Sequence, residues 1–216
     1  MCIRDSYSST AALAGIGLGA VIYAIVYWGF GFLRMSTAGL AAQSDGAGDE
    51  LALQAHILRA VPLGLAIGAL FILTQALLLP LAFQIYTASE AIERAAATYI
   101  SARLWGLPAT LGSIALMGWF IGISRTGLAL KMQIVLNAVN ILLSPLFVIG
   151  FGWGLYGVGI ASAIAEWAGL AAGLVLAGAE IKRRGGLRPD AKSRERLLNP
   201  NAVSYTHLTL PTIYSV

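Results

Sequence analysis

Three long stretches of this chain contain no charged residue. They cover residues 10–33, residues 60–89 (30 positions) and residues 132–165 (34 positions). A helix of roughly 20 residues crosses the apolar core of a bilayer, which is about 30 Å thick. The whole chain is 58% hydrophobic and only 11% charged, whereas a soluble domain is about 25% charged. A soluble globular fold is therefore excluded, and a multi-pass membrane protein is indicated.

The hydropathy pattern predicts an all-α, polytopic transmembrane helix bundle with about five spans. Short polar or glycine-rich breaks separate the apolar runs, as expected for connections between antiparallel spans. The bundle is predicted at residues 11–184. Its predicted spans are residues 11–42, 53–83, 91–124, 128–151 and 156–179.

The two ends of the sequence differ in character from the rest. Residues 1–10 are predicted to be a non-native or disordered end and residues 203–216 a non-native end, because both resemble translated sequencing adapters. The natural protein is then expected to be longer at both ends. Setting these ends aside removes Cys2, the one cysteine, so no disulfide, metal site or thiol chemistry is predicted.

The lysines and arginines of the loops predict the orientation of the spans. Nine of them flank one side, mostly within the sequence 182–196, and Arg94 flanks the other. The segment at 185–202 is therefore predicted to be a basic cytoplasmic segment, with the spans in a bacterial inner (plasma) membrane. A basic tail can also bind nucleic acid, but after a span a cytoplasmic flank is the favoured interpretation, and no nucleic-acid partner is expected.

Glycine pairs at four-residue spacing occur in most of the predicted spans. Such small residues let helix backbones approach closely in lipid, so we interpret them as packing positions. They are Gly15/Gly19, Gly64/Gly68, Gly118/Gly122 and Gly169/Gly173.

A few polar residues lie at membrane depth, where they are candidates for function. Asn137, Asn140 and Ser144 are three and four residues apart, so they share one helical face. Glu166 lies near the middle of the last span. We predict that these four residues line a cation or substrate cavity. The alternative is structural: Glu166 pairs with an arginine and the other three hold helices together.

Arg34 and Arg103 are predicted to be structural counter-charges rather than substrate ligands. Among the prolines, Pro145 is favoured as a hinge because it follows the polar Ser144. The sequence has no HExxH, P-loop or GxSxG motif. It is therefore not predicted to be an enzyme, and no cofactor is expected.

Several short runs resemble the DinF-like branch of the MATE (multidrug and toxic compound extrusion) transporters. The longest is Trp28–Gln43 (WGFGFLRMSTAGLAAQ), followed by GAGD at 46–49. The others are Gly118-Trp119, Asn137–Ile141, Gly157–Ala161 and Ala165–Trp167. The resemblance as a whole extends over about residues 11–184.

This resemblance implies a protein of twelve helices in two six-helix lobes around a central cavity. The five spans would then be helices two to six of the first lobe. It also implies export of amphipathic, often cationic drugs or toxins, coupled to entry of a proton or sodium ion. The expected partners are therefore the lipid bilayer, such a substrate and the coupling ion.

The chain departs from the family pattern at the cation site. The family often has an aspartate four residues after the conserved asparagine, whereas here Ser144 follows Asn140. A serine cannot take up and release a proton at physiological pH. Glu166, or an acidic residue of a first helix outside this sequence, is therefore the better proton carrier. Proton coupling is favoured over sodium. The alternatives are a lipid-linked sugar flippase of the same superfamily and a non-transporting membrane scaffold.

Overall fold

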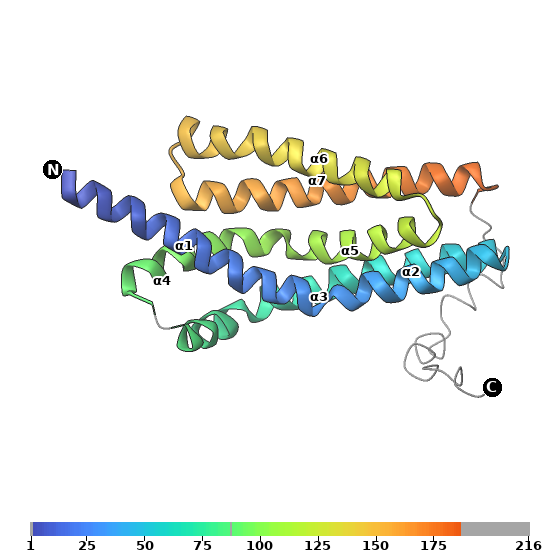
Figure 1. Ribbon diagram of the computed structural model, residues 1–216, viewed down its shortest axis with the longest axis horizontal. Coiled ribbons are helices and arrows are strands. Elements are labelled where there is room, and N and C mark those ends of the chain that lie inside the picture. The colour runs from blue at the N-terminus through green and yellow to red at the C-terminus, as the bar shows by residue number, and fades with distance from the viewer. Residues whose placement is uncertain (1, 87, 187–216) are drawn as a thin grey trace, which may run out of the picture.

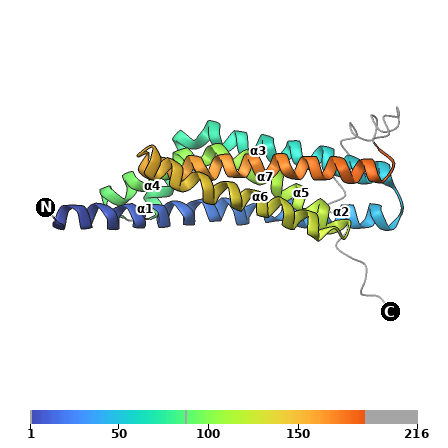
Figure 2. The ribbon, with the colours of Figure 1, turned by 90° about the horizontal axis from the view of Figure 1, so that it is seen from above.

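The computed structural model describes residues 2–86 and 88–186, and in this part of the chain it contains helices and no strand. The long helices run along the long axis of the molecule (Figure 1), and a view from above shows the same elongated bundle (Figure 2). In chain order the helices are α1 (Cys2–Gly29), α2 (Gly31–Gly46), α3 (Glu50–Ile85), α4 (Glu90–Arg103), α5 (Leu107–Gly122), α6 (Thr126–Pro145) and α7 (Gly154–Arg183). A 3-10 turn, Leu104–Gly106, joins α4 to α5, and a π-helical turn, Leu146–Gly150, follows α6.

Five helical segments of the described residues are long and apolar enough to cross a membrane. One combines α1 and α2, and another combines α4 and α5. The segments are Thr10–Gly46, Glu50–Ile85, Glu90–Gly122, Thr126–Gly150 and Gly154–Arg183. The prediction of an all-α bundle with five spans is therefore confirmed.

The structure describes the start of the chain, but most of its end lies outside the described residues. Residues 2–10, which the sequence set apart as a non-native or disordered end, lie in α1. Most of the basic segment at 185–202, and all of 203–216, lies outside the described residues.

Helix α5 forms the centre of the bundle. It packs against α2, α3 and α7, and its sequence is apolar on every side, as expected of a helix buried all round. Trp119 and Phe120 near its end are fully buried. The Trp119 indole Nε1 donates a hydrogen bond to the Leu53 carbonyl oxygen at 3.0 Å, so its one polar atom is satisfied in the core.

The glycine pairs lie where two helices approach most closely. A Cβ atom at Gly122 would lie 2.5 Å from the carbonyl oxygen of Ala38 in α2, and one at Gly64 would lie 2.7 Å from the Leu111 carbonyl in α5. A Cβ atom at Gly118 would collide with the Arg34 carbonyl oxygen. The interpretation of these glycines as packing positions is confirmed.

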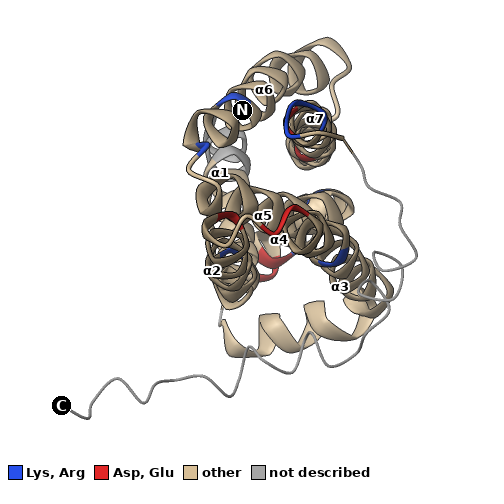
Figure 3. Cartoon of the chain, turned by 90° about the vertical axis from the view of Figure 1, so that its right-hand side faces the viewer, with Lys and Arg blue, Asp and Glu red and all other residues tan. Residues whose placement is uncertain are grey.

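One end of the bundle is held by a cluster of ion pairs. Figure 3 looks onto this end, with basic residues in blue and acidic residues in red. The Arg184 guanidinium Nη1 lies 2.5 Å from Asp45 Oδ1 and 3.2 Å from Glu50 Oε1, and its Nε lies 3.1 Å from Glu180 Oε1. Arg125 also pairs with Glu180, at 3.4 Å. The cluster joins the α2–α3 connection to the end of α7 and the start of α6.

Candidate functional site

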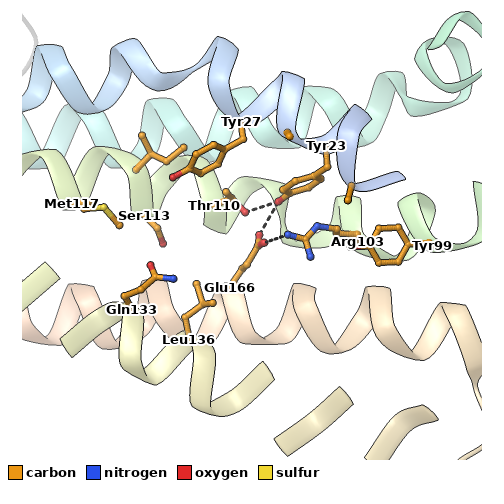
Figure 4. A pocket seen from close by; sticks show the side chains of 13 residues that line it. Tyr23, Tyr27, Tyr99, Arg103, Thr110, Ser113, Met117, Gln133, Leu136 and Glu166 are labelled. Atoms are coloured by element: carbon orange, nitrogen blue, oxygen red, sulfur yellow. Dashed lines mark hydrogen bonds and ion pairs between the residues drawn. The ribbon is translucent and has the colours of Figure 1, made fainter. Parts of the chain in front are cut away.

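A cavity of about 380 Å³ lies between α1, α4, α5, α6 and α7. Its wall combines three tyrosine rings with one acidic and one basic side chain, and Figure 4 shows their arrangement. The lining residues are Ala20, Tyr23, Ala24, Tyr27, Tyr99, Arg103, Thr110, Ser113, Ile114, Met117, Gln133, Leu136 and Glu166. The size is in the range of small-molecule sites, about 300–1,000 Å³.

Glu166 of α7 lies at the centre of the polar part of this cavity. Its side chain is 8% exposed, and its Oε1 accepts a hydrogen bond from Arg103 Nη2 of α4 at 3.2 Å. Burying either charge alone in an apolar bundle is costly, and pairing offsets part of that cost. The local sequence favours this meeting, because Gly106 leaves room for the carboxylate: a Cβ atom there would lie 2.9 Å from Glu166 Oε2.

A chain of oxygen atoms runs from Glu166 across two further helices. The Tyr23 hydroxyl of α1 lies 2.9 Å from Glu166 Oε2 and 2.7 Å from Thr110 Oγ1 of α5. Thr110 Oγ1 lies 3.1 Å from the Gly106 carbonyl oxygen, in the 3-10 turn between α4 and α5. Three oxygen–oxygen contacts thus link the cavity carboxyl to a break in the helical backbone.

The number of hydrogens available to this chain depends on the charge of Glu166. The tyrosine and the threonine have one hydroxyl hydrogen each, and a carbonyl or a carboxylate has none. With Glu166 ionised, two hydrogens serve three contacts, so one pair of oxygens faces without a hydrogen between them. A carboxylic acid at Glu166 supplies the third hydrogen, which would then be held at Oε2 facing Tyr23.

Two aromatic rings complete the surroundings of Arg103. Its guanidinium carbon lies 4.2 Å from the ring centroid of Tyr23 and 6.0 Å from that of Tyr99. A cation over a phenol ring is attracted by the negative face of the ring. The site therefore holds a positive charge with one carboxyl and two aromatic faces.

Asn137, Asn140 and Ser144 of α6 do not line this cavity. The Asn140 Nδ2 donates to Ser162 Oγ of α7 at 3.0 Å, and the Ser144 hydroxyl donates to Asn140 Oδ1 at 3.4 Å. Asn137 is exposed. The α6 residues that reach the cavity are Gln133 and Leu136. Gln133 lies four and seven residues before Asn137 and Asn140 and so shares their helical face; the residues differ in their position along the helix. Asn140 and Ser144 thus lie at the seam between α6 and α7.

The two predicted arginines occupy different environments. Arg103 pairs with Glu166 in the cavity wall, whereas Arg34 is half-buried on α2 and has no hydrogen bond or ion pair with the other described residues. Tyr23 and Thr110 were not predicted from the sequence. The available signal was the same as for Asn140, a polar group inside an apolar run, but such groups are common and their partners lie far away in the chain.

Residues 3–146 match the family model MatE. Over 177 residues the chain is 33% identical to DNA damage-inducible protein F of Escherichia coli (strain K12), a match that covers 82% of this chain and 39% of that protein. It is also 36% identical over 69 residues to Protein DETOXIFICATION 43 of Arabidopsis thaliana, covering 32% of this chain and 13% of that protein.

Solved structures with the same fold include a multidrug resistance MATE family transporter of the MOP superfamily in an inward-facing conformation. The TM-score is 0.71 at 18% identity, and the match covers 87% of this chain and 44% of that one. An outward-facing structure matches with a TM-score of 0.67 at 19% identity, over 90% of this chain and 47% of that one. The chain spans less than half the length of each of these relatives.

Proposed function

This chain belongs to the MatE family, and from that premise we propose that it forms helices two to six of the first lobe of a proton-coupled antiporter. Members of the family are transporters rather than enzymes. The proposed cargo is an amphipathic drug or toxin, cationic molecules included, exported across the bacterial inner membrane. The segment after about residue 180 is proposed to be cytoplasmic. Because the chain spans less than half of its relatives, it is expected to need the rest of the protein for transport.

The coupling residue in this proposal is Glu166, and the oxygen chain is the observation that supports it. Three contacts, at 2.9, 2.7 and 3.1 Å, need three hydrogens, and only a protonated Glu166 supplies the third. Proton binding therefore completes a set of hydrogen bonds across α1, α5 and α7. Proton release leaves one contact without a hydrogen, and it restores the full charge opposite Arg103.

The proposed mechanism is a shift between two packings of the lobe. The protonated form favours the complete chain from Glu166 through Tyr23 and Thr110 to the Gly106 carbonyl. The ionised form favours the charged pair with Arg103 and loosens the contact between Tyr23 and Thr110. A ligand biases such an equilibrium only through its different affinity for the two states, and here the proton has that difference. The two packings would correspond to inward- and outward-open states of the transporter.

Asn137, Asn140 and Ser144 have a secondary place in the proposal. At the seam of α6 and α7, Ser144 donates a hydrogen bond to Asn140, and Asn140 donates one to Ser162. None of these side chains takes up or releases a proton at physiological pH, so we assign them to positioning the two helices rather than to coupling.

The test is Glu166→Gln in the full-length parent protein. The amide keeps the size of the carboxyl and can donate to Tyr23, but it cannot take up or release the proton, so drug efflux driven by a proton gradient is expected to be abolished. Efflux of a fluorescent drug from energised membrane vesicles measures it. Glu90→Gln is the matched control, because Glu90 is an exposed carboxyl that pairs with Arg94 at the start of α4. Unchanged drug efflux in Glu166→Gln would remove Glu166 from the mechanism.

A further inference from the structure

Arg103 is held in the way a cationic ligand is held. Its guanidinium group lies over the ring of Tyr23 from α1, near the ring of Tyr99, and against the carboxyl of Glu166 from α7 (Figure 4). These three groups are the usual elements of a site for an organic cation, since phenol faces attract a positive charge and a carboxylate neutralises it.

The hydrogen bonds of Arg103 to this site are incomplete. The contact with Glu166 joins one nitrogen to one oxygen, at 3.2 Å, although guanidinium and carboxylate can form two parallel hydrogen bonds. The Nε atom of Arg103 is buried and has no hydrogen-bond partner among the residues that the structure describes. The guanidinium attached to α4 thus makes one of the two parallel contacts that an unattached group of the same shape could make.

We infer that Arg103 is a tethered occupant of a site for planar cations of the guanidinium or amidinium type. A free cation of this class would take its place against Glu166 and the two tyrosines. This inference rests on the proposed role of the cavity in transport and names the kind of ligand that the cavity accepts and the residue that competes with it.

Charge makes the two occupants mutually exclusive. Glu166 is the one carboxyl in the wall of the cavity, and two cations beside a single carboxylate repel each other strongly where water is scarce. The cavity has room for the exchange, because its volume is about 380 Å³. Its far wall carries Ser113 and Gln133, which can bind polar atoms of a larger ligand.

The test compares binding of methylguanidinium to the full-length parent protein and to two variants of it in detergent micelles. Arg103→Ala and Arg103→Gln both remove the internal cation, and Gln retains more of the side-chain packing. If Arg103 occupies the site about nine-tenths of the time, its removal strengthens apparent binding roughly tenfold. Isothermal titration calorimetry measures the affinity, and melting by circular dichroism confirms that at least one variant is folded.

Three controls make the result specific. Arg94→Ala removes an exposed arginine of the same helix and should leave the affinity of the wild type. Methylurea, a neutral molecule of similar shape, should not bind. Adding Glu166→Gln to Arg103→Ala should abolish the gain. Should neither Arg103 variant melt cooperatively alone, methylguanidinium at millimolar concentration must restore the transition.

Equal affinity for methylguanidinium in the wild type and the Arg103 variants would overturn the inference, as would binding that survives Glu166→Gln or no rescue of unfolded variants. This failure is distinct from failure of the proposed function. A chain that binds methylguanidinium only without Arg103, in a protein whose efflux ignores Glu166→Gln, supports the binding site and refutes the coupling role. If Glu166→Gln abolishes efflux but the affinity for methylguanidinium is the same with and without Arg103, the proposed function stands and only the role of Arg103 as an occupant of the site is refuted.

Discussion

At the scale of single residues, the site depends on charges that a bilayer tolerates only when they are satisfied. The sequence predicted Glu166 as a candidate because it is a carboxyl near the middle of a span, and it left open whether an arginine pairs with it. The structure supplies Arg103 as that partner. Tyr23 and Thr110 could not be predicted. Their hydroxyl groups matter because they lie within hydrogen-bond distance of each other, and the two residues are 87 positions apart in the chain.

Tyr23→Phe tests the hydroxyl of this residue separately from its ring. The ring over Arg103 is kept, but Glu166 and Thr110 each lose a hydrogen-bond partner. The free energy of unfolding in detergent micelles is expected to fall by about 1–2 kcal/mol, as measured by denaturant titration. Tyr27→Phe is the control, because the Tyr27 hydroxyl makes no hydrogen bond to other described residues. A similar loss in both variants would contradict the role given to the Tyr23 hydroxyl.

At the scale of helices, the sequence could predict only properties that belong to a single segment, such as its hydropathy. Hydropathy over about 20 residues belongs to one segment, and it predicted the number of spans that the described residues contain. The break at Leu104–Gly106 inside the third span has a signal in the sequence, because Gly106 and Pro108 disfavour an uninterrupted helix. Pro62 and Pro80 lie inside the continuous helix α3, so the sequence could not show which proline accompanies a break. Which part of α6 reaches the cavity could not be predicted either. Gln133 and Asn140 share one face by their spacing, and only the neighbouring helices decide that Gln133 lines the cavity while Asn140 meets Ser162.

Gly122→Ala tests the close approach of α2 and α5. The new Cβ atom would lie 2.5 Å from the Ala38 carbonyl oxygen and 2.6 Å from the Ala41 Cβ atom, so the two backbones must separate. We expect a loss of about 1–3 kcal/mol in the free energy of unfolding, measured by the same titration. Gly39→Ala on α2 is the matched control, because a Cβ atom there meets nothing within 4 Å. It should be neutral or slightly stabilising, and equal losses would show that spacing alone does not identify packing glycines.

At the scale of the whole molecule, charge gathers at one end of the bundle and a polar cavity lies in its interior. The basic residues after the last span predicted the orientation of the chain, but which charges pair could not be known before the helix ends were placed. Burial alone would lower the pKa of Arg184, yet its hydrogen bonds to Asp45 and Glu180 raise the pKa above its usual value. Arg184 therefore stays charged, and the cluster is lost only when its acids are protonated.

Arg184→Ala is expected to loosen this end of the bundle. The change removes contacts to Asp45, Glu50 and Glu180 at once and leaves Glu180, whose side chain is 7% exposed, with fewer partners. The free energy of unfolding should fall by about 2–3 kcal/mol. Lys182→Ala, an exposed residue two positions earlier, should change it by less than about 0.5 kcal/mol. A fall in Arg184→Ala no larger than in Lys182→Ala would mean that the cluster does not hold the helices.

The 3-10 turn between α4 and α5 has a mechanical consequence. Arg103 lies on one side of it and Thr110 on the other, and both are attached, directly or through Tyr23, to the same carboxyl of α7. Glu166 thus contacts both halves of the third span, the half before the turn through Arg103 and the half after it through Tyr23 and Thr110. In the mechanism proposed above, a proton on Glu166 would strengthen its contact through Tyr23 and Thr110, and its loss would strengthen the pair with Arg103. The angle between the two halves of the span would then depend on the charge of Glu166.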